Sequence, residues 1–172
     1  PIIVAPMFLI SNTKMIKAAL ANGGSAAFPA LNYRTDAELR AAITDIKAAT
    51  NKPFGVNLIV NKSNPKYKPQ LKTLAEMKVD YIITSLGSPK EVIDVCKPLG
   101  IKVFCDVVDL AYAQKVEALG ADALIAVNSR AGGHAGNISP EELVRLLTTH
   151  CRIPVISAGG VGHGKDVANA LA

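Results

Sequence analysis

A glycine-rich segment with a histidine at its centre holds the residues best suited to chemistry. It reads Asn128-Ser129-Arg130-Ala131-Gly132-Gly133-His134-Ala135-Gly136 and follows an apolar run, 123–127, that predicts a buried strand. Glycines let a backbone approach a ligand closely, and histidine readily gains or loses a proton near neutral pH. A single loop histidine is usually only a polar surface residue, but these neighbours make His134 a candidate catalytic residue.

A second glycine-rich segment, residues 158–164, follows the predicted strand 153–157. Backbone N–H groups of such a loop can cradle phosphate oxygens, helped by the positive end of the following helix. The run from Gly159 to Asp166 nearly matches a P-loop, but Asp166 stands where a hydroxyl must hold Mg²⁺. The loop therefore favours a phosphate-bearing cofactor over a P-loop nucleotide site.

Both loops belong to a regular alternation of strands and helices. Continuous apolar segments predict strands at 1–7, 25–31, 54–60, 81–86, 101–108, 123–127 and 153–157. Helices are predicted between them, with a capping box at Thr35–Glu38 and further start signals at Ser88-Pro89 and Ser139-Pro140. This alternation is typical of a parallel sheet covered by helices.

Two architectures fit this alternation, a closed (β/α)₈ TIM barrel and an open doubly wound sheet. Seven evenly spaced units favour the barrel, which typically needs about 250 residues. The sequence has 172 residues, begins at Pro1 and ends inside a predicted helix. We therefore expect a single barrel domain over 1–172 that is truncated after the seventh strand and the start of the seventh helix, with the eighth strand absent.

In a barrel, the carboxyl ends of all strands face one side, so the residues that follow them should converge. This set is small and mostly polar. It contains Ala5, Pro6, Met7, Asn57, Thr84, Ser85, Asp106, the loop 131–136 and residues 157–160. We assign no role to Asp106.

Four motifs in this set resemble those of the FMN-dependent nitronate monooxygenases, also called 2-nitropropane dioxygenases. They are Ala5-Pro6-Met7, Phe54-Gly55-Val56-Asn57, the 131–136 run Ala-Gly-Gly-His-Ala-Gly, and Ser157-Ala158-Gly159-Gly160-Val161. The related FMN-dependent enoyl-acyl-carrier-protein reductases share the histidine run. Both families are FMN-dependent (β/α)₈ barrels, so the resemblance implies FMN as cofactor. The cysteines show no metal-ligand spacing, so no metal is expected.

The resemblance implies a role for each matching position. His134 would face the substrate, as a general base or as a positioning donor. Asn128 stands in a Val-Asn pair where the family often has Gln-Gly, and it would replace the lost flavin contact. Arg130 stands where an acidic residue is common. The implied cofactor-binding residues are Ala5, Pro6, Met7, Asn57 and Asn128 at the flavin, Ala131, Gly132 and Gly133 beneath its ring or phosphate chain, and Gly159 and Gly160 at the phosphate. Thr84 is a further predicted cofactor-binding residue.

The implied function is oxidation of alkyl nitronates or nitroalkanes by O₂ to carbonyl compounds and nitrite. One alternative is an FMN-dependent enoyl-acyl-carrier-protein reductase, which would need a nicotinamide cofactor. An alternative of another class is a flavin-binding barrel remnant without catalysis. The encoded length of the gene separates the remnant from the enzymes.

The overall composition excludes several other classes of protein. The chain is 49% hydrophobic and carries a net charge of +5. No apolar run of membrane length, signal peptide or groove of interleaved basic and aromatic residues is visible, so neither a membrane nor a nucleic acid is expected as a partner. The lysines between 62 and 72 are interpreted as a solvated helix face rather than an anion-binding loop. Cys96, Cys105 and Cys151 fit reduced thiols of a cytoplasmic protein, and a homodimer is left open.

Overall fold

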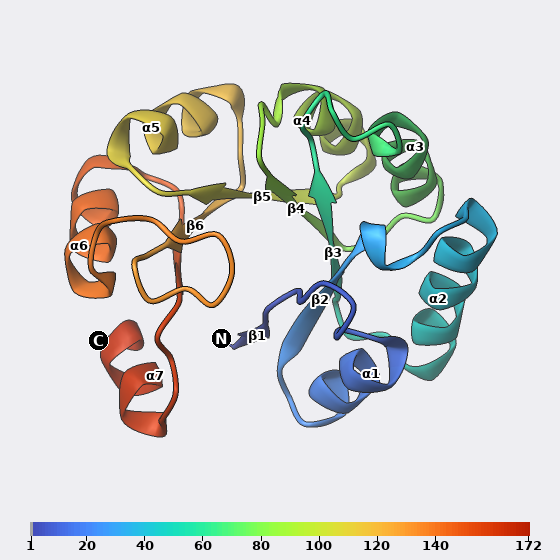
Figure 1. Cartoon of the computed structure of the whole chain (residues 1–172), viewed down its shortest axis with the longest axis horizontal. Coiled ribbons are helices and arrows are strands. Elements are labelled where there is room, and N and C mark those ends of the chain that lie inside the picture. Colours follow the sequence, from blue (N-terminus) through green and yellow to red (C-terminus); the bar gives the residue numbers. More distant parts are fainter. Residues whose placement is uncertain (1) are drawn as a thin grey trace. The chain divides into compact units, whose positions relative to one another are not determined.

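The computed structural model describes residues 2–172, and the chain divides into two compact units, Pro1–Val103 and Phe104–Ala172. In the first unit, four parallel strands lie side by side in the order in which they occur in the sequence, and helices cover them (Figure 1). The strands are β1 (Ile3–Val4), β2 (Ser25–Pro29), β3 (Gly55–Ile59) and β4 (Tyr81–Ser85). The helices are α1 (Thr13–Ala21), α2 (Asp36–Ala49), α3 (Tyr67–Glu76) and α4 (Lys90–Cys96), with short 3₁₀ turns η1 (Ala30–Asn32) and η2 (Lys97–Leu99).

The second unit repeats this pattern with fewer elements. Strand β5 (Lys102–Val107), which begins two residues before the unit boundary, pairs in parallel with β6 (Ala123–Val127), and β6 pairs in parallel with β7 (Val155–Ala158). The helices that follow these strands are α5 (Leu110–Leu119), α6 (Pro140–His150) and α7 (Gly164–Leu171). Helix α6 packs on β6 and β7 and buries Leu143 and Leu147 completely. Both units therefore show the sequential parallel β/α order that the sequence predicts.

Local signals explain where the helices begin. At α2, the Thr35 hydroxyl accepts a hydrogen bond from the Glu38 N–H at 3.2 Å, and the Glu38 carboxylate accepts one from the Thr35 N–H at 3.0 Å. This is the predicted capping box, and it satisfies N–H groups that have no partner within the helix. Ser139 caps α6 in the same way through the Glu142 N–H, with Pro140 at the first helical position.

The core of the first unit explains one of the motif glycines. A Cβ atom on Gly55 would lie 2.0 Å from the Tyr81 ring, so no larger residue fits there without moving that ring. The Tyr81 hydroxyl shares a 2.8 Å hydrogen bond with the Ser25 hydroxyl and donates to the Ala26 carbonyl at 3.1 Å. Gly55 therefore serves packing between β3 and β4, and its presence in the motif does not require a ligand contact.

Several predicted boundaries were wrong by a few residues. Strand β1 ends at Val4 instead of residue 7, and Pro6, which lacks an N–H for a sheet ladder, follows closely. The end of the second predicted strand is the turn η1, and the seventh strand begins at Val155, after Pro154. Pro89 precedes α4 rather than occupying its first turn, and the Ser88 hydroxyl accepts only a long hydrogen bond, 3.5 Å, from the Lys90 N–H. Residue 1 lies outside the described residues.

Three further findings concern possible membrane-spanning helices, metal ligands and disulfides. No helix formed by residues 2–172 is long and apolar enough to cross a membrane. Within the same residues, no group of three or more His, Cys, Asp or Glu side chains could hold a metal ion. Cys96, Cys105 and Cys151 are buried and take part in no disulfide of the described chain.

Candidate functional site

Asn128 connects the two glycine-rich loops of the second unit. Its side chain is fully buried, and its amide nitrogen donates to the Gly159 carbonyl at 3.1 Å. Its amide oxygen accepts from the Arg130 N–H at 2.8 Å. Backbone bonds add to this connection, because the Asn128 N–H donates to the Ala158 carbonyl and the Asn128 carbonyl accepts from the Ala131 N–H. Both ends of the Asn128 amide are thus occupied by the loops that it holds together.

Gly159 and Gly160 lie where the two loops approach each other most closely. Both have left-handed backbone conformations, with φ of 121° and 76°. A Cβ on Gly159 would lie 2.5 Å from the Asn128 amide oxygen and 2.6 Å from the Ala131 nitrogen, and a Cβ on Gly160 would lie 2.9 Å from the Arg130 side chain. Both the backbone conformation and the available space therefore demand glycine at these two positions.

Gly132 and Gly133 differ from that pair. Both are exposed, neither has a positive φ, and a Cβ on either would meet no atom within 4 Å. Nothing in the surrounding protein therefore requires glycine at these positions, and a molecule that approaches the loop from outside would have the space to lie against its backbone. His134, which follows directly, is also exposed.

The loop after β7 presents N–H groups of two kinds. The Gly162 and His163 N–H groups donate to the Asp166 carboxylate at 3.0 and 2.8 Å, and they hold the pKa of this carboxyl below its usual range. By contrast, the N–H groups of Gly159 and Gly160 have no acceptor among residues 2–172. Because backbone donors near the start of a helix suit anions, these two could donate hydrogen bonds to a phosphate oxygen.

In the first unit, the predicted residues lie after β1 and on β3 and β4. Ala5 is exposed, while Pro6 and Met7 are half-buried. Their loop is held in place because the Met7 N–H donates to the buried Ser11 hydroxyl at 2.9 Å. Asn32 adds a second connection that the sequence analysis missed, since it accepts from the Leu9 N–H at 2.8 Å and donates to the Ser11 carbonyl at 2.9 Å.

Asn57 on β3 keeps part of its side chain available. Its amide nitrogen donates to the Ser85 hydroxyl at 2.7 Å and to the Ile83 carbonyl at 3.2 Å. Its amide oxygen has no hydrogen-bond donor among the described residues 2–172. A half-buried acceptor of this kind can bind a ring N–H, which a flavin has. Thr84, the next predicted residue, is buried on β4, and Asp106 is half-buried on β5.

The structure brings only part of the predicted set together in each unit. Asn57 and Thr84 lie on the adjacent strands β3 and β4, but Thr84 pairs with Leu58, so its side chain lies on the opposite face of the sheet from Asn57. In the second unit, the two glycine-rich loops meet through Asn128. The sequence analysis missed the exposed Leu86 and the pocket that it lines, because a leucine beyond a strand carries no recognisable signal. It also missed the two hydrogen bonds of the Asn128 side chain.

Parallel strands in sequence order, each followed by a helix, place the chain in the class of (β/α)₈ barrel proteins. The sequence model of the nitronate monooxygenase family matches residues 1–71 and 62–172, and so covers the chain from end to end. The chain belongs to the nitronate monooxygenase family, a family of oxidoreductases, as the motifs predict.

Individual relatives support both the fold and the family. Over the whole chain, 32% of residues are identical to (3aS,4S,5R,7aS)-5-hydroxy-7a-methyl-1-oxo-octahydro-1H-indene-4-carboxyl-CoA dehydrogenase of Rhodococcus jostii, of which the match covers 48%. A nitronate monooxygenase of Paraburkholderia phytofirmans is 29% identical, with all of the chain and 59% of the relative covered. The solved structure of FabK from Thermotoga maritima matches with a TM-score of 0.92 and 33% identity, over 99% of this chain and 54% of that one. The chain therefore spans about half the length of these proteins, and its seven β/α units confirm the predicted TIM-barrel fold.

Proposed function

We propose that the protein containing this chain is an FMN-dependent nitronate monooxygenase, which converts alkyl nitronates or nitroalkanes and O₂ to carbonyl compounds and nitrite. The observation that carries the proposal is the pair of open glycines, Gly132 and Gly133, directly before the exposed His134. They lie in a chain that the nitronate monooxygenase family model matches throughout. The overall reaction balances when two nitronate anions and one O₂ give two carbonyl compounds and two nitrite ions.

Each unit, taken by itself, presents groups that suit part of an FMN molecule. The N–H groups of Gly159 and Gly160 would bind its phosphate, and the open backbone at Gly132 and Gly133 leaves room for it. The Asn57 amide oxygen would accept a ring N–H, with Ala5, Pro6 and Met7 as the other predicted contacts at the ring. When bound, FMN would supply the electron acceptor that the oxidation of a nitronate needs.

His134 would act on the proton of the substrate. A neutral nitroalkane must lose a proton from the carbon next to the nitro group before it becomes a nitronate, and an exposed imidazole can accept that proton. A nitronate has already lost it. His134→Ala should therefore lower kcat/KM for a neutral nitroalkane by about 10²- to 10⁴-fold, and much less for the corresponding nitronate. His150→Ala, which removes another exposed histidine, is the matched control. An equal loss on both substrates would leave His134 a positioning role only.

The first experiment is a visible absorption spectrum of the purified full-length protein. A flavin spectrum, followed by O₂ consumption and nitrite release from propyl nitronate, is the expected result. A colourless protein that also binds no added FMN would overturn the proposal.

A second candidate function is oxidation or reduction of an acyl thioester. The supporting observation is the length of the alignments. The match to the Rhodococcus CoA dehydrogenase runs over 172 residues, the length of this chain, whereas the match to the Paraburkholderia nitronate monooxygenase runs over 218 residues. The latter relative thus has a segment with no counterpart here. The two functions are separated under anaerobic conditions, because an enoyl reductase would be reduced by NADH or NADPH, whereas a nitronate monooxygenase needs no nicotinamide.

A further inference from the structure

Leu86, the first residue after β4, combines a strained backbone with an exposed apolar side chain. Its φ is 60°, in the left-handed region that side chains other than glycine rarely adopt, and the residue is 48% exposed. Among residues 2–172, only Leu9 and Lys78 are further non-glycine residues with positive φ. Lys78 directly follows the C-cap of α3, where such a conformation is common. Leu86 is about half exposed and does not belong to the core, so core packing does not explain the strain.

Neighbouring residues fix this conformation. A Cβ on Gly87 would lie 2.8 Å from the Val60 carbonyl oxygen, so glycine is needed directly after Leu86. The Val60 N–H donates to the carbonyl of Ser85, the residue directly before Leu86, at 3.0 Å. Backbone strain that the surrounding structure enforces is found preferentially at functional sites, so the space that the Leu86 side chain faces is a candidate ligand site.

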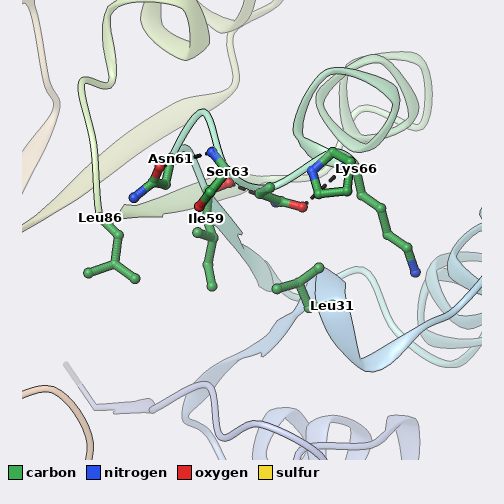
Figure 2. Close-up of a pocket in the computed structure, with 8 residues that line it drawn as sticks. Leu31, Ile59, Asn61, Ser63, Lys66 and Leu86 are labelled. Carbon is green, nitrogen blue, oxygen red and sulfur yellow. Dashed lines mark hydrogen bonds between the residues drawn. The ribbon is translucent and has the colours of Figure 1, made fainter.

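Leu86 lines an open pocket of about 410 Å³, within the range of small-molecule sites. Figure 2 shows the aliphatic side chains of Leu31, Ile59 and Leu86 facing the same space from η1, from β3 and from the end of β4. The fourth side is the loop 61–66. This loop is held by its own hydrogen bonds, in which the Asn64 amide donates to the Ile59 carbonyl at 2.9 Å and accepts from the Lys66 N–H at 3.0 Å.

The charges near the pocket show what kind of ligand it suits. Lys66 is the one charged residue among those that line it, and its ammonium group points away and donates to the Arg34 carbonyl at 2.8 Å (Figure 2). Lys68 and Lys72 on α3 form ion pairs with Glu91 and Glu76. The remaining lining residues are aliphatic or neutral. A neutral hydrocarbon chain therefore fits the pocket better than a phosphate or a carboxylate.

The pocket adjoins the residues predicted to contact the flavin ring. Asn57 and Ile59 are two residues apart on β3 and so lie on the same face of the strand, which is the less buried one. Ile59 pairs with Ser85, which accepts the Asn57 hydrogen bond and directly precedes Leu86. A substrate whose reacting end lies near Asn57 could therefore extend its chain along β3 into the pocket.

We propose that the pocket between Leu31, Ile59, Leu86 and the loop 61–66 binds the unbranched alkyl chain of the substrate, and that Leu86 determines the preferred chain length. This inference rests on the proposed function, because it names a subsite for the same substrate. Each buried methylene group contributes about fourfold to binding, which corresponds to about 0.8 kcal/mol. A longer alkyl chain should therefore bind more tightly until the pocket is filled.

The test measures binding separately from turnover. Alkyl carboxylates share the charge and planar shape of nitronates but do not react, so butyrate and octanoate are titrated calorimetrically into the full-length protein. We expect octanoate to bind at least about tenfold more tightly, and Leu86→Ala to reduce this preference about three- to tenfold. Leu31→Ala should have the same effect from a different element. Leu99→Ala, which truncates a leucine of similar exposure on η2, should leave the preference unchanged.

Turnover of nitronates prepared from nitroethane through 1-nitrooctane gives the second measurement. The proposal expects kcat/KM to rise with chain length in the wild type and to rise less in Leu86→Ala. If no nitronate reacts while octanoate binding still depends on Leu86, the proposed function fails and the alkyl subsite stands. If Leu86→Ala and Leu31→Ala keep the wild-type preference for octanoate, or if the wild type has none, the subsite is refuted.

Discussion

Replacement of Asn128 tests whether one buried amide holds the two glycine-rich loops together. Asn128→Ala removes the 3.1 Å hydrogen bond to the Gly159 carbonyl and the 2.8 Å bond from the Arg130 N–H. A typical hydrogen bond contributes about 1 kcal/mol net, and a buried group left without a partner costs about 1–3 kcal/mol more. Gly159 is only half-buried and Arg130 is exposed, so water can satisfy part of what is lost. We therefore expect the free energy of unfolding to fall by about 2–3 kcal/mol.

The same change should weaken binding of FMN to the loops. If about half of the lost energy is needed to restore the loops on binding, the dissociation constant rises by about tenfold, because about 1.4 kcal/mol corresponds to a factor of ten. Urea unfolding and titration of the apoprotein with FMN, followed by quenching of flavin fluorescence, measure the two effects. Asn137→Ala, which removes an exposed amide on the same loop, is the matched control.

Asn128→Asp distinguishes the hydrogen bonds from the volume of the side chain. One carboxylate oxygen can still accept from the Arg130 N–H, but at neutral pH the other oxygen faces the Gly159 carbonyl without a proton to donate. The protonated acid can donate again, so the stability deficit of Asn128→Asp should shrink as the pH falls. The reasoning is refuted if Asn128→Ala unfolds within about 0.5 kcal/mol of the Asn137→Ala control and binds FMN equally well.

Three further predictions concern other residues of the two units. Gly133→Ala should leave the urea midpoint unchanged but weaken FMN binding, because a Cβ at this position meets no protein atom. Gly159→Ala should lower the urea midpoint, because its Cβ would overlap the Asn128 amide. Gly55→Ala should destabilise the protein by about 2–4 kcal/mol in urea unfolding, since its Cβ would overlap the ring of Tyr81. The pKa of Asp166 is lowered in the folded state, so its stabilising effect is present above the ordinary carboxyl pKa and is lost as the pH falls through the lowered value. Melting temperatures of Asp166→Asn and wild type should thus differ at pH 7 and converge in acid, and a constant difference would contradict this account.

Elements that depend on neighbours in the sequence were predicted well. The box at Thr35 and Glu38 and the cap at Ser139 involve residues three positions apart, so the sequence contains the whole interaction. Strand β6 has the predicted bounds because it is a continuous apolar run between a glycine turn and a polar loop. The order of the strands followed from the alternation of strands and helices, since parallel neighbours need a crossover between them.

Features that depend on tertiary packing were not predicted. The turn η1 replaces the end of a predicted strand, and Asn32 within it bonds to a loop more than twenty residues earlier. The left-handed leucine at position 86 has no sequence signature, because turn chemistry predicts glycine or asparagine in that conformation. At the candidate site, the two glycine-rich loops and His134 were predicted from their motifs, and their roles stay predictions. Only the three-dimensional structure distinguishes glycines at which a Cβ atom would meet neighbouring atoms from glycines at which it would meet none.

The sequential strand order of the first unit has a consequence for how the protein is made. Each strand from β1 to β3 pairs with the strand that comes next in the sequence, across one intervening α-helix. Pairing with the next strand closes smaller loops than pairing between more distant strands would, which lowers the entropic cost of forming the sheet. Synthesis on the ribosome proceeds from the amino terminus at about 5–20 residues per second, so this unit has several seconds to assemble while later residues are still being added. Each new helix–strand pair finds its docking edge already in place, which shortens the time during which apolar strands such as β3 remain exposed to aggregation.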